Sequence, residues 1–211
     1  MNQTDFNTFA GQSRSSLERK GSRFIGFGFP LESRDEFDHR REKLVEEFPK
    51  ATHIVSASVI LESDRPVERY DSDGEPSGTA GEPILGVLKG EDLVNAAIFA
   101  VRYFGGTELG TGGLVRAYSD TARGVIDAAS IINRRKRREY LVSFPYSFTG
   151  KVAETLSGFG EVEVIARDFG QKPTLTLSVP VNDEDRLLDR LREVTSGSVD
   201  LTREEPDKEE D

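Results

Sequence analysis

The sequence has no cysteine and only two histidines, His39 and His53. Without cysteine the chain can form no disulfide, no cysteine-ligated zinc or iron–sulfur site and no thiol nucleophile. Two histidines also argue against a multi-histidine metal site. No apolar run approaches the ~20 residues of a membrane-spanning helix, and residues 1–10 are polar and acidic, unlike a signal peptide. These absences predict a cytoplasmic protein with no membrane segment.

Lysine is scarce among the charged residues. Of 28 cationic side chains 8 are lysine and 20 are arginine, and 38 acidic residues give a net charge of −10. An acidic surface with little lysine retains its hydration when salt screens charges, which would fit a halophilic source. Ordinary acidic drift explains the same composition. At 211 residues, the chain is long enough to bury a core without disulfides or metal.

Hydrophobic patterning predicts the first domain, over residues 15–133. Residues 1–12 have no periodicity and are expected to lack regular structure, whereas Lys20-Gly21 predicts a hairpin turn between two extended stretches. Ser33 and Glu36 form a capping box that opens a helix. The helix is expected to bury Phe37, Leu44, Val45 and Phe48. The pattern further predicts strands over 53–61 and 94–104, a polar loop over 62–82, and helices over 84–88 and 114–130.

A second domain is predicted over residues 139–203. Its strands and helices alternate in the order βαββαβ, the ferredoxin-like arrangement, and residues 204–211 form an acidic tail. Between the domains lies a basic run, which predicts a solvated boundary that could also grip a phosphate backbone. The run consists of Arg134, Arg135, Lys136, Arg137 and Arg138. The fold class is therefore α/β in the broad sense, and α+β in detail.

The acidic segment at residues 71–82 is the first candidate site. Asp71, Asp73 and Glu75 alternate, and carboxylate oxygens are hard ligands that suit a divalent cation. The distal glutamate of a calcium-binding loop is not in its place, and Asp73-Gly74 is a strong turn signal by itself. The segment is therefore either a metal site or a solvated turn, and the turn is the simpler interpretation.

The glycine-rich segment at residues 105–113 is the second candidate site. It joins a predicted strand to a predicted helix, an arrangement in which backbone N–H groups and the helix N-terminus attract anions. Arg102 and Arg116 flank it and could neutralise a phosphate. The glycines expected at such an anion or nucleic-acid site are Gly105, Gly106, Gly112 and Gly113. The alternative is a tight turn where loops pack closely. The segment matches neither a Walker A motif nor a dinucleotide fingerprint, so we expect no cofactor.

Both segments resemble known family motifs. Residues 73–81 (DGEPSGTAG) and 102–118 (RYFGG…LGTGGLVRAY) are similar to the motifs of the IMPACT/YigZ family, as are residues 22–25 (SRFI) and 51–53 (ATH). The resemblance covers about residues 15–203. Ser72 and Glu108 depart from the family pattern, in which Asp and Lys are common, and both changes weaken a metal or phosphate role at those positions.

The resemblance implies a fold and an association. The first domain should be similar to domain 2 of ribosomal small-subunit protein five, and the second to the C-terminal ferredoxin-like domains of elongation factor G. Eukaryotic members regulate translation, and the family has no established catalytic residues. We therefore expect a non-enzymatic protein that binds RNA, the ribosome or a translation factor through its glycine-rich loops. The alternative is an enzyme that holds a nucleotide or phosphate ligand with the same loop pair.

Overall fold

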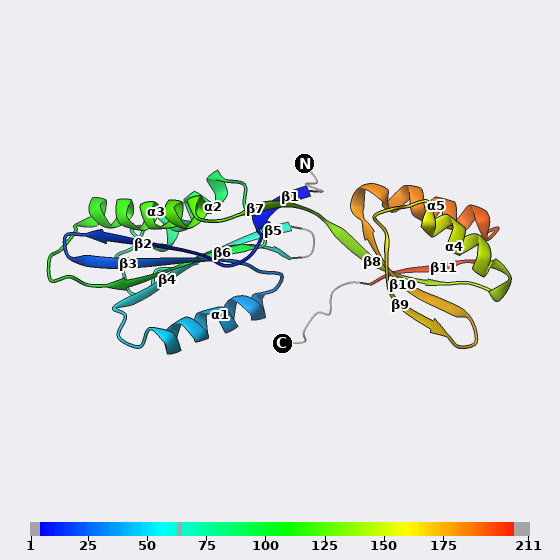
Figure 1. Ribbon diagram of the computed structural model, residues 1–211, viewed down its shortest axis with the longest axis horizontal. Coiled ribbons are helices and arrows are strands. Elements are labelled where there is room, and N and C mark those ends of the chain that lie inside the picture. Colours follow the sequence, from blue (N-terminus) through cyan, green and yellow to red (C-terminus); the bar gives the residue numbers. More distant parts are fainter. Residues whose placement is uncertain (1–4, 63–64, 205–211) are drawn as a thin grey trace. The chain divides into compact units, whose positions relative to one another are not determined.

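The computed structural model describes residues 5–62 and 65–204, which divide into two compact units. The first unit is Phe6–Arg134, and the second comprises the residues from Arg135 onward together with Asp5. Each is built on an antiparallel sheet with helices packed against it, so the chain is an α+β protein (Figure 1). None of the helices in the described ranges combines the length and apolar composition that crossing a membrane requires.

The first unit is a five-stranded sheet in the order β2-β3-β6-β4-β5, with a smaller pair formed by β1 and β7. Figure 1 shows α2 and α3 on one face of the large sheet and α1 on the other. The elements are β1 (Asp5–Phe9), β2 (Ser13–Arg19), β3 (Ser22–Pro30), α1 (Arg34–Glu47), β4 (His53–Glu62), β5 (Arg65–Asp71), α2 (Gly81–Gly90), β6 (Ala96–Tyr103), α3 (Thr111–Asp127) and β7 (Ile131–Arg135).

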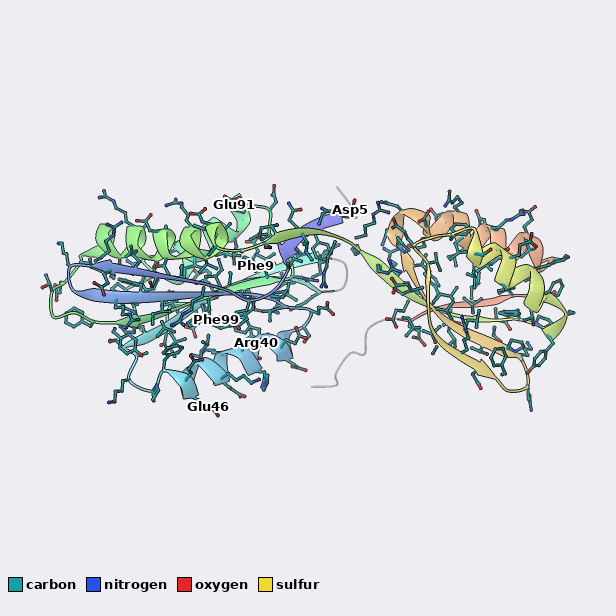
Figure 2. The ribbon with its side chains drawn as sticks, viewed as in Figure 1. Asp5, Phe9, Arg40, Glu46, Glu91 and Phe99 are labelled. Atoms are coloured by element: carbon teal, nitrogen blue, oxygen red, sulfur yellow. The ribbon has the colours of Figure 1, made fainter. Side chains whose placement is uncertain are left out.

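A separate apolar core lies on each face of this sheet. Phe24, Leu88 and Tyr118 pack between the sheet and helices α2 and α3. On the other face, the ring of Phe99 stacks on Phe37 of α1 with the centroids 5.0 Å apart, and Figure 2 shows this layer. The central strands are buried on both sides because both faces are covered.

Helix α1 begins as its capping box predicts and buries less than expected. The Ser33 side chain accepts a hydrogen bond from the Glu36 amide at 3.2 Å. Phe37 and Leu44 are buried, whereas Val45, predicted to lie on the same face, is 45% exposed. Val45 directly follows Leu44, and successive helical residues point about 100° apart, so only one of the two faces the sheet.

Two predictions about irregular segments are wrong. Residues 5–9, expected to lack regular structure, form β1, and residues 65–71 of the predicted loop over 62–82 form the edge strand β5. β5 contains Pro66 and several charged residues, which protect an exposed sheet edge and also hide the strand from hydrophobic patterning. The Lys20-Gly21 hairpin turn is confirmed, with both residues at positive φ.

The second unit has the predicted βαββαβ order, and its sheet is ordered β11-β8-β10-β9. Its apolar core, which includes Val142, Leu177 and Leu191, lies between this sheet and helices α4 and α5. The elements are β8 (Arg137–Ser143), α4 (Thr149–Ser157), β9 (Glu163–Phe169), β10 (Pro173–Pro180), α5 (Glu184–Val194) and β11 (Asp200–Glu204), with single 3-10 turns at η1 (Tyr146–Phe148) and η2 (Val181–Asp183). Residues 205–211 of the expected acidic tail lie outside the described residues.

Candidate functional site

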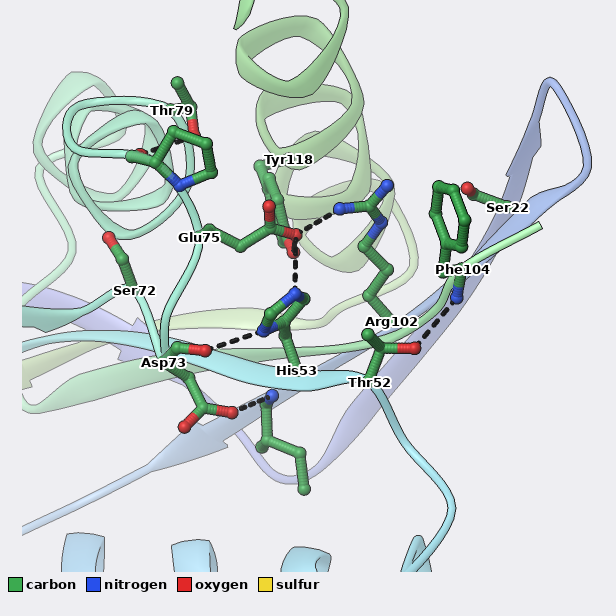
Figure 3. Close-up of polar contacts among 12 residues, drawn as sticks. Ser22, Thr52, His53, Ser72, Asp73, Glu75, Thr79, Arg102, Phe104 and Tyr118 are labelled. Atoms are coloured by element: carbon green, nitrogen blue, oxygen red, sulfur yellow. Dashed lines mark hydrogen bonds and ion pairs between the residues drawn. The ribbon is translucent and has the colours of Figure 1, made fainter. Parts of the chain in front are cut away.

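A buried carboxylate, Glu75, joins several of the sequence motifs. Asp73 and Gly74 both have positive φ, and the turn they form directs Glu75 inward, where it is 8% exposed. Glu75 Oε1 accepts hydrogen bonds from Arg102 of β6 and, at 2.6 Å, from the Tyr118 hydroxyl of α3 (Figure 3). The loop over residues 72–80 is therefore fastened to the strand and to the helix that the glycine-rich segment connects.

His53 and Asp73 fasten the same loop to β4. His53 Nδ1 lies 2.6 Å from the Asp73 carbonyl oxygen, which can only accept, so Nδ1 carries a proton. The Nε2 atom then faces Glu75 Oε1 at 3.8 Å. The Asp73 side chain accepts a hydrogen bond from the Ile54 amide at 2.6 Å. Glu75, Arg102, Tyr118, His53 and Asp73 are called the Glu75 network below.

Arg102 is the buried cation of the Glu75 network. Its guanidinium lies 5.4 Å from the ring centroid of Phe24 and 5.7 Å from that of Phe104, and its side chain is 7% exposed. Its Nε has no hydrogen-bond partner within the described residues. Burial, and then the hydrogen bond to Glu75, raise the pKa of the Tyr118 phenol well above its usual range. Tyr118 therefore remains a neutral donor to Glu75.

The candidate metal ligands of the 71–82 segment are bound by other groups of the protein: Arg41 lies near both Asp71 and Asp73, at 3.4 and 3.7 Å, whereas Glu75 faces the interior. Asp71 accepts a hydrogen bond from the Asp73 amide at 2.9 Å and from Arg41 at 3.4 Å, and Glu75 is bound by Arg102 and Tyr118. Across residues 5–62 and 65–204, no three His, Cys, Asp or Glu side chains are grouped as metal ligands would be. The structure therefore does not bring Asp71, Asp73 and Glu75 together as a metal site.

The start of the glycine-rich segment packs closely against the turn between β2 and β3. A Cβ atom on Gly105 would lie 1.9 Å from the Gly21 carbonyl carbon, because the hairpin turn lies directly against the segment. The Gly105 amide donates to Ser22 Oγ at 3.1 Å, and the Phe104 amide donates to Thr52 Oγ1 at 3.0 Å. At Gly105 the structure thus agrees with the tight-turn interpretation. Gly106 has a positive φ of 82° and open space around it.

The end of the segment, by contrast, borders a concavity of about 500 Å³ at the N-terminus of α3. Gly112 and Arg116, two of the candidate anion-binding residues, line it, and a Cβ atom added to Gly112 would meet no other atom within 4 Å. The hairpin turn contributes two cations that sequence reasoning did not place at the site. The lining residues are Arg19, Lys20, Leu109, Gly112, Gly113, Arg116 and Asp120. This surface, called the α3 concavity below, is the open part of the candidate site.

The basic run does not form one open cluster. Arg134 and Arg135 end β7 and are exposed, Arg137 and Arg138 begin β8, and the division between the two units falls within the run, between Arg134 and Arg135. Their carboxylate partners come from separate segments. Arg134 pairs with Glu32 at 2.7 Å, Arg135 pairs with Glu161, Arg137 lies 3.4 Å from Glu163, Arg138 pairs with Glu184, and Lys136 also has an interaction within the chain.

Known proteins are similar to this chain in sequence and in structure. The Impact N-terminal domain matches residues 20–126. IMPACT family member YvyE of Bacillus subtilis is 30% identical over 194 residues, 91% of this chain and 87% of that protein. IMPACT family member YigZ of Escherichia coli is 31% identical over 162 residues, 76% and 78% of the two chains. A crystal structure of a hypothetical protein is 26% identical, with a TM-score of 0.72, covering 97% of this chain and 99% of its own.

Proposed function

Since the chain belongs to the IMPACT family, we propose that it is a non-enzymatic binding protein associated with translation. Its ligand in this proposal is RNA, free or as part of the ribosome, and its binding surface is the α3 concavity. The observation that carries the proposal is the grouping of Lys20, Arg19 and Arg116 beside open glycine backbone at the start of a 17-residue helix. Cations and unpaired N–H groups together suit the phosphates of a nucleic acid.

The charge distribution favours an RNA contact that is confined to a small part of the surface. A net charge of −10 repels RNA at long range, so binding must come from a small surface where cations predominate. Arg19 is paired with Asp120 at 3.0 Å, and Glu108 lies in the glycine-rich segment, which leaves Lys20 and Arg116 as the principal phosphate partners. We therefore expect moderate affinity and a shallow dependence on salt.

The open face of the second unit does not suit RNA. On the side of its sheet away from α4 and α5, one row across the four strands is Asp200, Ser143, Thr174 and Asp168. A second row is Glu204, Glu139, Ser178 and Glu163. Open sheets that bind RNA stack bases on aromatic side chains, and both rows have carboxylates and hydroxyls instead. This supports placing the RNA surface on the first unit.

We further propose the two domain relationships that the family resemblance implies. The sheet order β11-β8-β10-β9 with both helices on one face supports a ferredoxin-like second domain over 139–203, similar to those of elongation factor G. The first domain, over 15–133, is proposed to be similar to domain 2 of ribosomal small-subunit protein five. Both relationships agree with a partner in translation, whether the ribosome or a translation factor.

The alternative enzyme interpretation relied on Arg102, Arg116, Asp73 and Glu75 as its polar groups. In the structure Arg102 and Glu75 neutralise each other in the interior, and Asp73 is bonded to the Ile54 amide. Those three side chains hold the fold together, and Arg116 remains with the α3 concavity. The binding-protein proposal therefore accounts for more of the geometry.

Salt-dependent RNA binding tests the proposal. For a single-stranded RNA of about 12 nucleotides, each of the variants Lys20→Gln and Arg116→Gln should reduce the slope of log affinity against log salt by about 0.7. The matched control is Arg190→Gln, which removes an exposed cation of α5 in the second unit. The measurement is fluorescence anisotropy of labelled RNA across a salt series.

Equal slopes for the wild type, Lys20→Gln and Arg116→Gln would contradict an RNA contact at the α3 concavity. Co-sedimentation with ribosomes, measured on the same variants, separates a ribosomal RNA contact from a protein contact. Ribosome binding that survives both substitutions would point to a translation factor or ribosomal protein as the partner instead.

A further inference from the structure

Phe104 is an exposed aromatic ring on a fixed backbone. It follows the last residue of β6 and is 48% exposed. Its amide is bound by Thr52, and the next residue, Gly105, is bound by Ser22 and packed against Gly21. These contacts hold the backbone on both sides and so fix the point from which the ring projects.

One side of this ring is occupied by a cation. The Arg102 guanidinium lies 5.7 Å from the ring centroid, and Figure 3 shows the two side chains next to each other. Arg102 is held in place by the buried Glu75 carboxylate, so the cation–π contact is a permanent part of the fold. The exposed part of Phe104 is the part of the ring that Arg102 does not cover. This part is flat, apolar and open to solvent.

The surroundings of Phe104 connect it with the α3 concavity. Phe104 does not itself line the concavity, but the next residue, Gly105, packs against Gly21, which directly follows Lys20 of the concavity. An aromatic ring beside cations that can bind phosphates is the combination found where proteins bind single-stranded nucleic acids. Of the other aromatic residues of this motif, Tyr118 is fully buried in the Glu75 network and cannot stack on a ligand.

We propose that the exposed side of Phe104 is a stacking platform for one base of single-stranded RNA. The inference rests on the proposed function and goes beyond it, because it names the strandedness of the RNA and the residue that recognises it. Bases inside a duplex are stacked on their neighbours and cannot stack on a protein ring, whereas an unpaired base can. Stacking is also tolerant of sequence, since every base has a planar face.

The absence of tryptophan from the chain makes a direct test possible. In Phe104→Trp the single indole keeps the stacking surface, and its emission should be quenched when single-stranded RNA is added. The control is Phe169→Trp, at a 60%-exposed aromatic position in the second unit, whose emission should not change. Phe104→Leu, which keeps an apolar side chain without the ring, should weaken RNA binding by about 5-fold to about 150-fold, the range of base-stacking contributions.

Phe104→Leu should leave the salt slope unchanged, because no cation is lost. If RNA binding shows the expected salt dependence while Phe104→Leu binds as the wild type and Phe104→Trp is not quenched, the stacking proposal is overturned and the proposed function remains. Duplex RNA bound as tightly as a single strand would also overturn it. Quenching by a mononucleotide that equals quenching by the oligonucleotide would replace RNA with a free nucleotide as the ligand. A wild-type chain that binds no RNA would overturn both proposals.

Discussion

Replacing Glu75 with alanine should lower the free energy of unfolding by about 3–5 kcal/mol, the cost of removing one partner of a buried ion pair. The Arg102 guanidinium would remain in the interior between Phe24 and Phe104, with its main acceptor gone. The Tyr118 hydroxyl would lose its acceptor in the same step. Urea denaturation at neutral pH measures the change.

The control is an ion pair of similar chemistry at the surface. Glu193→Ala removes the partner of Arg190, where both side chains are more than half exposed, and it should change stability by less than about 1 kcal/mol. The double variant Glu75→Leu with Arg102→Met should recover much of the loss, because an apolar pair leaves no buried charge behind. A loss below about 1 kcal/mol for Glu75→Ala would show that water reaches Arg102 and compensates it.

The Glu75 network explains why the two sequence motifs occur together. His53, Glu75, Arg102 and Tyr118 come from four separate segments, and the fold brings them to one point. Residue types alone favoured a surface role for Asp73, Glu75 and Arg102, because a charged side chain in a polar segment is normally solvated. Only the tertiary structure shows that Glu75 and Arg102 are buried together, and that the Asp73 carboxylate, which stays 36% exposed, is bonded to the Ile54 amide.

Periodicity predicted the elements that have an apolar face and failed where that face is missing. α3 was predictable because Leu114, Ala117, Tyr118, Thr121, Ala122 and Val125 repeat at helical spacing, and all are buried. β7 has no buried residue, and β5, at a sheet edge, has none either, with only Val67 and Arg69 half-buried, so neither has the apolar–polar contrast on which a prediction depends. Strand pairing supplies their stability instead: β7 pairs with β1, which is remote in sequence, and β5 pairs with the preceding strand β4.

The α3 concavity was predictable in part for a related reason. Gly112 and Arg116 were identified from the strand–glycine–helix pattern, which is local in sequence. Lys20 belongs to a hairpin that was also predicted, but its position beside α3 depends on the packing of Gly21 against Gly105. That contact joins residues more than eighty positions apart, and no periodicity encodes it. The same contact determines what a substitution at Gly105 should do to stability.

Gly105→Ala should destabilise the protein by roughly 3 kcal/mol, the upper end of the range for overpacking. The added Cβ would lie 1.9 Å from the Gly21 carbonyl carbon and 2.2 Å from the Ser22 nitrogen, and these are backbone atoms that no rotamer change can move. The glycine-rich segment must therefore separate from the hairpin turn, which breaks the bond between the Gly105 amide and Ser22. Urea denaturation measures the loss.

The matched control is Gly112→Ala, seven residues further along the same segment. Gly112 lies in the first turn of α3, with negative φ and no atom within 4 Å of the Cβ position, so alanine fits without a clash. Alanine also restricts the unfolded chain more than glycine does, so stability should rise by about 0.4–1 kcal/mol. Because Gly105→Ala displaces both Phe104 and Lys20, RNA affinity should fall together with stability in that variant. Equal stability of the two variants would show that the segment can shift away from the hairpin at no cost, and Gly105 would then have no packing role.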